Sequence, residues 1–291
     1  MLPYLCLASA TMIVGAYVGF SKLLVAVFPV FLLAWLRFGI AAVAMATWLK
    51  RGLNEAPLDS RTKHLLFLES FLGNFLFSIC MLYGMRHATA ISAGIIMAGI
   101  PAAVALLSRI FLREQMSARM IVAIALAVAG VSALALSRGN ATDASNSALG
   151  TLLLIGAVFC EASYVVIGKR LTGKLSPKRI SALINLWGLA LVTPLGIWAA
   201  LSFDFQAVSV GVWGGLLLYA LAASMWTVWL WMTGLKKIPA AKAGVFTVFL
   251  PITSALVGVI FLGENFTVVH VIAFAFALAG VLLATWPTRE M

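Results

Sequence analysis

The chain has 291 residues, of which 63% are hydrophobic and only 10% are charged, and its mean hydropathy is +1.09. A soluble domain is about a quarter charged, so most of this chain is expected to face lipid. The net charge of +11 would suggest nucleic acid in a soluble protein. Here the basic residues lie at the ends of apolar runs, which favours the lipid bilayer, and not nucleic acid, as the partner.

Ten apolar runs are each long enough, at about 20 residues, to cross a hydrocarbon core of about 30 Å. In chain order they cover residues 4–24, 29–49, 64–85, 89–111, 117–137, 148–170, 178–201, 209–234, 239–262 and 266–286. The connections between them are short and leave no room for a soluble domain, which excludes an ATP-driven pump within this chain. The sequence therefore predicts an all-α membrane protein with ten transmembrane helices.

The first two runs each contain one conspicuous polar side chain. Tyr17 lies in the first run and has a counterpart in the sixth, Tyr164. Each ring could stack on a flat substrate or simply pack, and both are candidate cavity residues. Arg37 lies inside the second run, where it could reach outward to the interface, pair with an acid, or bind a substrate carboxylate.

The third run has a polar stripe and an acid. Ser70, Asn74 and Ser78 recur every four residues, so they share one helix face. Polar residues at membrane depth either join helices by hydrogen bonds or line a path, and the sequence leaves both roles open. Glu69 is expected near the cytoplasmic end of this run, as an ion-pair or gate residue, with Lys242 of the ninth run as the second candidate gate residue.

The fourth and ninth runs contain prolines near their middles, Pro101 and Pro251. A proline inside a helix frees the carbonyl four residues earlier, here at Met97 and Thr247. In lipid such a group must be satisfied by protein or by a water-filled cavity. We therefore interpret both prolines as kinks, with a cavity-lining kink favoured over simple packing.

The sixth and eighth runs supply the remaining candidates. Glu161 lies about ten residues, or about 15 Å, into the sixth run, where an ionised carboxylate is costly unless it is paired or hydrated. It could carry a proton, bind a substrate ammonium, or form a structural pair with Arg37. In the eighth run, Ser224 corresponds to Asn74, and Thr227 continues the same face.

Residues 84–136 are repeated at 234–286 without a gap, with 17 of 53 positions identical. The two halves, 1–140 and 147–291, hold five runs each, and an odd number makes equivalent helices cross in opposite directions. Of the 20 Lys and Arg residues, 16 fall on one side of the membrane and 3 on the other. The richer side is expected to be cytoplasmic, with both termini there, and the sequence predicts a 5+5 inverted repeat.

The repeated pattern resembles the domain of the drug/metabolite transporter superfamily, in its ten-helix EamA-type form. In the first half it reads Gly-x-Pro at 99–101, Ile-Phe-Leu-Arg-Glu at 110–114 and Ala-Val-Ala-Gly-Val at 127–131. The second half repeats the proline, then has Ile-Phe-Leu-Gly-Glu at 260–264 and Ala-Leu-Ala-Gly-Val at 277–281. Glu114 and Glu264 are expected to contact the start of the next helix, where the helix dipole stabilises a carboxylate. The resemblance implies a central cavity lined mainly by spans 1, 3, 4, 6, 8 and 9. Bacterial amino-acid and metabolite exporters are the most similar branch in size.

The sequence thus favours a secondary transporter, an exporter of amino acids including aromatic ones, in a bacterial inner membrane. Other metabolites or cationic drugs are the alternative substrates. A membrane-embedded enzyme is disfavoured, because the aspartates lie in loops, the histidines lie near span ends, and no catalytic constellation shares one depth. A non-transporting interaction protein stays open. We expect a small-molecule substrate and no catalytic residue, cofactor or metal site.

Overall fold

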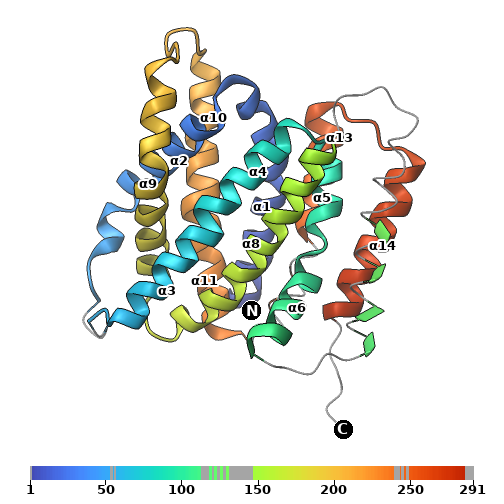
Figure 1. Cartoon of the computed structure of the whole chain (residues 1–291), viewed down its shortest axis with the longest axis horizontal. Helices are drawn as coiled ribbons and strands as arrows, with labels where there is room; N and C mark the ends of the chain where they lie inside the picture. The colour runs from blue at the N-terminus through green and yellow to red at the C-terminus, as the bar shows by residue number, and fades with distance from the viewer. Residues whose placement is uncertain are drawn as a thin grey trace.

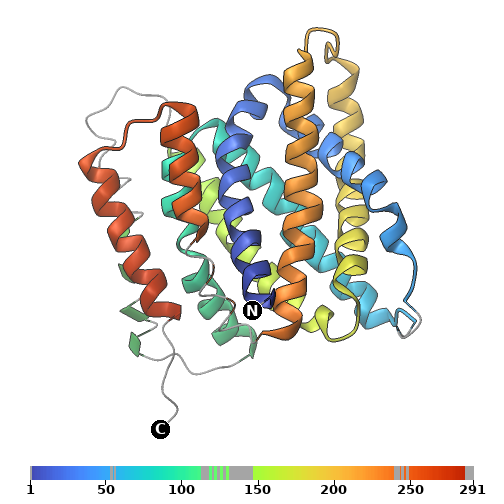
Figure 2. The same cartoon turned by 180° about the vertical axis from the view of Figure 1, so that it is seen from behind.

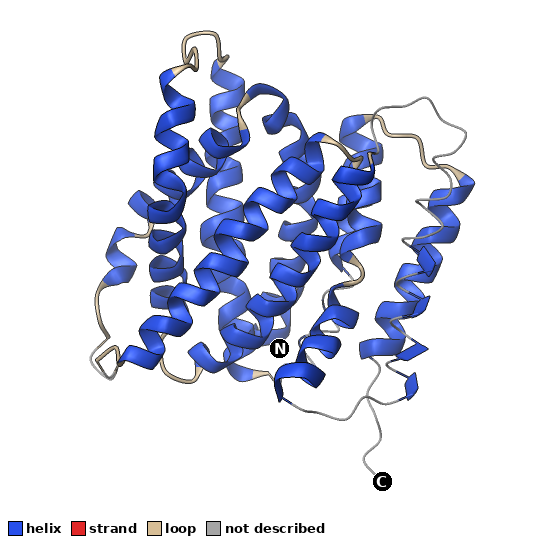
Figure 3. Ribbon diagram, viewed as in Figure 1, coloured by secondary structure: helices blue, strands red, loops and turns tan. Residues whose placement is uncertain are grey.

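The computed structural model describes residues 2–52, 55, 57–112, 147–238 and 249–285, together with isolated positions at 118–119, 121–122, 125–126, 129–130, 243 and 246. Within these ranges the regular structure is entirely helical, as Figure 3 shows. Five helical segments are long and apolar enough to cross a membrane, and four shorter apolar helices accompany them. The all-α class is therefore confirmed for the described residues, and the length and composition of these helices fit a membrane protein. Most of the predicted span at 117–137 lies outside the described residues, so the count of ten remains a prediction.

The helices coincide closely with the predicted spans wherever the chain is described. In chain order they are α1 (Leu2–Val27), α2 (Val30–Ala44), η1 (Ala46–Leu49), α3 (Ser60–Ser70), η2 (Phe71–Leu76), α4 (Phe77–Arg86), α5 (Ala90–Met97), α6 (Ile100–Leu112), α8 (Ala148–Thr172), α9 (Pro177–Leu201), α10 (Val210–Ala220), η4 (Leu221–Trp226), α11 (Thr227–Lys237), α13 (Phe249–Leu262) and α14 (Val268–Thr285).

Short polar residues start several of these helices. Asp59 accepts a hydrogen bond from Thr62 N, Thr89 accepts one from Ser92 N, and Ser147 accepts one from Gly150 N. Each bond satisfies a backbone donor that has no partner inside its own helix. Pro177 occupies the first turn of α9, where its missing N–H costs nothing. The starts of α3, α5, α8 and α9 are thus set by local chemistry as well as by hydropathy.

Two of the long spans contain a π-helical turn in the same place. One turn, η2, interrupts the third span, and the other, η4, interrupts the eighth span 150 residues later. Such turns widen the helix by one residue and recur at functional sites. Their matched position follows the register of the sequence repeat.

The helices form one bundle in which segments from the two halves of the sequence alternate. Figure 2 shows α1 between α13 and the α10–η4–α11 segment, and α1 contacts both α13 and α11. From the opposite side, Figure 1 shows α8 beside α4, and α8 also contacts α6. α2 packs on α9, while α14 lies at the edge of the bundle against α5 and α6. Leu7, Leu82, Leu154 and Ile184 are fully buried at these contacts.

Candidate functional site

A cavity of about 50 Å³ lies among α1, α2, η2–α4, α6, α8, η4–α11 and α13. Its wall therefore draws on the predicted spans 1, 3, 4, 6, 8 and 9, and also on span 2. The residues that form it are Ala10, Thr11, Val14, Tyr17, Arg37, Gly73, Asn74, Phe77, Ile100, Glu161, Tyr164, Val165, Ala223, Thr227, Val228, Trp231 and Leu250.

Five of the candidate residues from the sequence lie on this wall. They are Tyr17, Asn74, Glu161, Tyr164 and Thr227. Three other candidates are buried without reaching the wall: Ser78, Met97 and Ser224. Thr247 and Lys242 lie outside the described residues.

Arg37 is the main addition to the predicted wall. Its side chain is 3% exposed and points into the bundle, where its Nη2 donates a hydrogen bond to Ser78 Oγ. Ser78 in turn donates to the carbonyl oxygen of Asn74. The guanidinium carbon lies 4.2 Å from the centre of the Phe38 ring. The sequence showed that Arg37 lies within a span, but only packing shows which way it turns.

The polar stripe of the third span joins helices by hydrogen bonds and also reaches the cavity wall. Ser70 Oγ and Asn74 Nδ2 donate to the carbonyl oxygen of Ile184 in α9, at 2.6 and 3.0 Å. These bonds join α3 and η2 to α9. Asn74 also forms part of the cavity wall. Hydrogen bonding between helices and lining the cavity are therefore combined in one residue.

Pro101 lies near a helix start rather than in the middle of a long helix. The fourth span breaks at Ala98 and Gly99, whose N–H groups donate to Gly94 O and Ile96 O, both at 3.0 Å. Pro101 is then the second residue of α6. Pro251 lies in α13, and the residues just before Phe249 are outside the described part of the chain, so a kink at Pro251 stays a prediction. The residue before each proline, Ile100 or Leu250, belongs to the wall.

Glu161 and Arg37 place opposite charges on the same wall. They form no ion pair with each other, and the described residues provide neither with another ion-pair partner. Tyr17 lies close enough to both side chains to interact with their charges. An unpaired charge at membrane depth is costly, so the cavity holds two groups that a ligand of matching charges would stabilise.

Aromatic and hydroxyl groups around the cavity lack partners as well. Among the described residues, no hydrogen bond reaches Tyr164 Oη, Thr227 Oγ1, Trp231 Nε1, Ser224 Oγ, Tyr219 Oη or Arg37 Nε. All but Ser224 and Tyr219 belong to residues of the wall, and Tyr219 packs edge-on against Tyr17 with ring centres 5.9 Å apart. Buried polar atoms normally have partners, so such a concentration indicates a site for water or a polar ligand.

Glu69, the candidate gate residue, is completely buried in α3. Neither of its carboxylate oxygens has a hydrogen-bond partner in the described part of the chain. It lies against Gly168 of α8, where an added Cβ would stand 2.8 Å from Glu69 Oε1 and 3.0 Å from Met232 Cε. Since Lys242 is not among the described residues, a gate formed by these two stays a prediction.

Glu264, the last residue of the repeated motif Ile-Phe-Leu-Gly-Glu, connects helices at one end of the bundle. Its carboxylate accepts hydrogen bonds from Ala90 N at 2.9 Å, Ile91 N at 3.0 Å and Lys22 Nζ at 2.9 Å. The sequence predicted a contact at the start of the next helix, and the structure shows instead that Glu264 caps α5, in the other half of the chain. A carboxylate is stabilised there by the helix dipole. The equivalent residue Glu114 lies outside the described residues.

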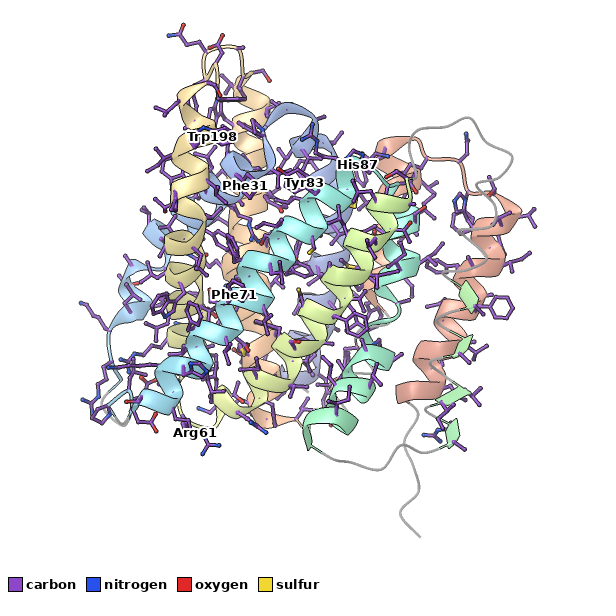
Figure 4. All side chains as sticks on the ribbon, viewed as in Figure 1. Phe31, Arg61, Phe71, Tyr83, His87 and Trp198 are labelled. Carbon is purple, nitrogen blue, oxygen red and sulfur yellow. The ribbon has the colours of Figure 1, made fainter. Side chains whose placement is uncertain are left out.

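The opposite end has its own polar contacts. Arg179 Nη1 and Ser176 N donate to the carboxylate of Glu55, at 2.6 and 2.7 Å. Burial of this carboxylate favours its neutral form, but these hydrogen bonds and the charge of Arg179 outweigh that effect and lower the pKa of Glu55 to about 2. The contacts tie the segment before α3 to the start of α9. In Figure 4, Arg61 lies at this end and His87 and Trp198 lie toward the other.

Comparison with known proteins identifies a family, two relatives in sequence and a solved structure with the same fold. The model of the EamA-like transporter family matches residues 1–136 and again 148–286. The uncharacterized transporter YetK of Bacillus subtilis (strain 168) is 36% identical over 291 residues, covering 99% of this chain and 88% of that protein. The uncharacterized transporter YyaM of the same organism is 25% identical, covering 98% and 94%. A crystal structure with 18% identity has the same fold, with a TM-score of 0.68 over 97% of this chain and 95% of that chain.

Proposed function

We propose, from the premise that this chain belongs to the EamA-like transporter family, that it is a secondary exporter of amino acids, aromatic ones included. The substrate would bind in the central cavity and cross by alternating access of that cavity to the two sides. The membrane would be a bacterial inner (plasma) membrane, with both termini in the cytoplasm. The end of the bundle that holds Glu55 and Arg61 would then be the cytoplasmic end.

The observation that carries this proposal is the pair of unpaired opposite charges on one wall, Arg37 and Glu161. An amino acid has a carboxylate and an ammonium on one carbon and could satisfy both at once. A charge-assisted hydrogen bond of this kind is about twice as strong as a neutral one. A ligand with only one charge would leave the other charged wall group without a partner, which is unfavourable.

The aromatic and apolar residues of the cavity wall favour amino acids with an aromatic side chain as substrates. Tyr17, Tyr164 and Trp231 border the cavity together with Val14, Phe77 and Leu250. Aromatic pairs contribute about 0.5–1.5 kcal/mol beyond the burial of their area. Such a wall would hold an apolar or aromatic side chain while the two charges hold the backbone groups of the amino acid.

Alternating access is supported by the reciprocal arrangement of the halves. α1 packs on α11, and α8, its counterpart in the repeat, packs on α4, the counterpart of α11. The π-helical turns η2 and η4 both contribute to the wall. Transporters built from such repeats bind substrate at the interface of the repeats and move one against the other. Pro101 and Pro251 would allow the helix segments beside the cavity to tilt.

Flux through purified protein in liposomes tests the proposal. Phenylalanine should cross, while phenylalanine amide, which has no carboxylate, and 3-phenylpropionate, which has no ammonium, should cross poorly. Asp204→Asn, in an exposed loop, is the matched control for purification and reconstitution. Chemical conversion without flux would identify an enzyme instead, and neither flux nor conversion would favour an interaction protein.

Cationic compounds are the second candidate. Among the described residues on the wall or next to it there are two acids, Glu69 and Glu161, and one cation, Arg37. Transport of phenylalanine amide in preference to phenylalanine would favour this candidate.

Export, rather than import, is tested with oriented vesicles in which one or the other end of the protein faces the medium. Faster flux from the Arg61 end to the opposite end would support export.

A further inference from the structure

Three titratable side chains follow one another from the cavity toward one end of the bundle. Glu161 and Tyr164 lie on the wall, and Gly168, one turn further along α8, lies against Glu69. Positions 161, 164 and 168 share one helix face and extend about 10 Å along the axis. Glu69 is therefore about two helical turns from Glu161, with Tyr164 between them.

The Tyr164 side chain also packs against η2, close to Glu69 in the sequence. A Cβ on Gly73, four residues after Glu69, would lie 2.9 Å from Tyr164 Cβ. The charge of Glu161 therefore acts on both Tyr164 and Glu69. Glu69 is 0% exposed and Tyr164 is 6% exposed, and the described residues offer no hydrogen bond to Glu69 Oε1, Glu69 Oε2 or Tyr164 Oη. A buried acid without a partner costs free energy, so a structural account of Glu69 lacks the contact that would justify it.

The other elements packed on α3 provide no free opposite charge at Glu69. On α8, Lys169 donates to Leu235 O and Ile238 O, at 2.7 and 2.9 Å, and Arg170 is exposed. On α9, Arg179 is bound to Glu55, and the Lys178 ammonium lies over the Trp48 ring, 5.6 Å from its centre. The π-helical turn η2 carries no titratable residue. Among the described acids, Glu161 is the one whose charge acts on Glu69.

The equivalent positions in the opposite halves of the repeat show that packing alone does not require these acids. Tyr164 corresponds to Tyr17, and Glu161 corresponds to Val14, which also lies on the wall. In the register of the π-helical turns, Glu69 corresponds to Tyr219. Tyr17 packs edge-on against Tyr219, at an angle of 82°. One side of the cavity thus has valine and tyrosine where the other side has two carboxyl groups.

We propose that Glu161, Tyr164 and Glu69 form a proton pathway between the cavity and the end of the bundle where α3 begins, so that substrate is exchanged for protons. A proton would pass from the Glu161 carboxyl group to the Tyr164 hydroxyl oxygen while the hydroxyl proton passes to the Glu69 carboxylate. Tyrosine is neutral before and after, no electrons are transferred, and one proton moves. Each transfer needs a side-chain rotation or one bridging water. Deprotonated Glu161 is then free to bind the substrate ammonium, a step that rests on the proposed function.

The test compares two measurements on the same liposomes. Counterflow of labelled phenylalanine against unlabelled phenylalanine at equal pH reports substrate binding and movement without a proton gradient. Accumulation driven by an acidic interior reports coupling, because a pH difference of about one unit sustains about tenfold accumulation per exchanged proton. Wild-type protein should accumulate phenylalanine when the interior is acidic and not when only a sodium gradient is imposed.

Glu69→Gln should keep counterflow but lose accumulation driven by the pH gradient. Tyr83→Phe is the control, because it removes a tyrosine hydroxyl from α4 outside the cavity wall and the pathway, and it should retain both. If Glu69→Gln does not fold, Tyr164→Phe is the second test. A pH-sensitive dye inside the liposomes then measures proton movement. This variant should slow proton release during substrate flux.

Three results would overturn the pathway and leave the transporter proposal intact. These are wild-type flux that ignores the pH gradient, accumulation that follows sodium, and Glu69→Gln protein with undiminished pH-driven accumulation. Accumulation only with an alkaline interior would overturn the exchange of substrate for protons. Absence of flux for every amino acid would instead overturn the proposed function together with the pathway.

Discussion

Lys22 at the end of α1 and Glu264 in the loop between α13 and α14 form an ion pair, with Nζ and Oε1 2.9 Å apart. The glutamate side chain is 8% exposed, and the lysine side chain is 31% exposed. Because the same carboxylate accepts the Ala90 and Ile91 N–H groups, a single side chain holds α1, α5 and the α13–α14 loop together.

Glu264→Gln should therefore weaken this end of the bundle. The amide loses the charge that the helix dipole and Lys22 favour, and its NH₂ group cannot accept from both backbone donors. We expect the free energy of unfolding to fall by about 1–2 kcal/mol, measured by thermal or denaturant unfolding in detergent. Asp204→Asn, an exposed acid in the loop between α9 and α10, is the control and should change little. Equal stability of the two variants would contradict the capping role.

Gly73→Ala should disturb the cavity through Tyr164. A Cβ on Gly73 would lie 2.9 Å from Tyr164 Cβ and 3.0 Å from its Cγ, so the ring or the π-helical turn η2 must shift. Overpacking of this kind costs about 1–3 kcal/mol. We expect lower thermal stability and reduced flux.

Gly214→Ala is the matched control for this substitution. No atom lies within 4 Å of a Cβ at that position in α10, so no clash arises. Alanine is favoured over glycine in a helix by about 1 kcal/mol. The control should be neutral or slightly stabilised, and a Gly73→Ala variant that behaved in the same way would show that the contact with Tyr164 is not tight.

Glu55 should contribute a stabilisation of the folded protein that is lost at acidic pH. Its pKa is lowered to about 2 in the folded chain by Ser176 and Arg179, whereas an unfolded glutamate titrates near about 4.3. The stabilisation is complete above the unfolded value and disappears as the pH falls toward about 2. Glu55→Gln should flatten the decline in unfolding temperature between about pH 5 and pH 3. An unchanged decline would mean that other carboxylates control it.

The sequence predicted where each helix lies along the chain, but it predicted less well toward which side of the helix a side chain points. Hydropathy located the helices because lipid imposes the same length and polarity on every span. The polar stripe and the mid-span acid identified Asn74 and Glu161 as candidates, and both lie on the cavity wall. It could not show that Arg37 turns inward to Ser78, because a lysine or arginine stem is flexible enough to point either way. The sharing of Ile184 O by Ser70 and Asn74 depends on the packing of α9, which no local pattern specifies.

Interruptions of helices were the least predictable features. The prolines indicated interruptions in spans 4 and 9, but the break at Ala98 and Gly99 leaves Pro101 in the first turn of a new helix, where it is well tolerated. The π-helical turns η2 and η4 have no marker residue in common. Their positions depend on contacts between helices, and only the repeat register relates them. Glu264 was expected to contact the neighbouring helix start, whereas tertiary packing brings it to α5.

Orientation is tested by labelling single cysteines in intact cells, after replacement of Cys6, Cys80 and Cys160. Asp204→Cys and Lys174→Cys lie in connections on opposite sides of α9, and both native side chains are solvent-exposed. The excess of basic residues on one side predicts that this side is cytoplasmic. A membrane-impermeant thiol reagent should therefore label position 204 from outside and should label position 174 only after permeabilisation. Labelling of position 174 in intact cells would reverse the proposed direction of transport.

Arg37→Gln and Glu161→Gln should change substrate preference in opposite senses. Without the guanidinium, the wall loses its partner for a carboxylate, so the preference for phenylalanine over phenylalanine amide should fall. Without the Glu161 carboxylate, the preference for phenylalanine over 3-phenylpropionate should fall instead. Each loss should be at least about tenfold in relative flux, since a buried charged hydrogen bond is worth about 1.5–3 kcal/mol. Ser78→Ala, which removes the hydrogen bond to Arg37 but no wall group, should shift the first ratio only slightly. A uniform loss of flux for all three compounds, in both glutamine variants, would mean that the two charges maintain the fold and do not select the substrate.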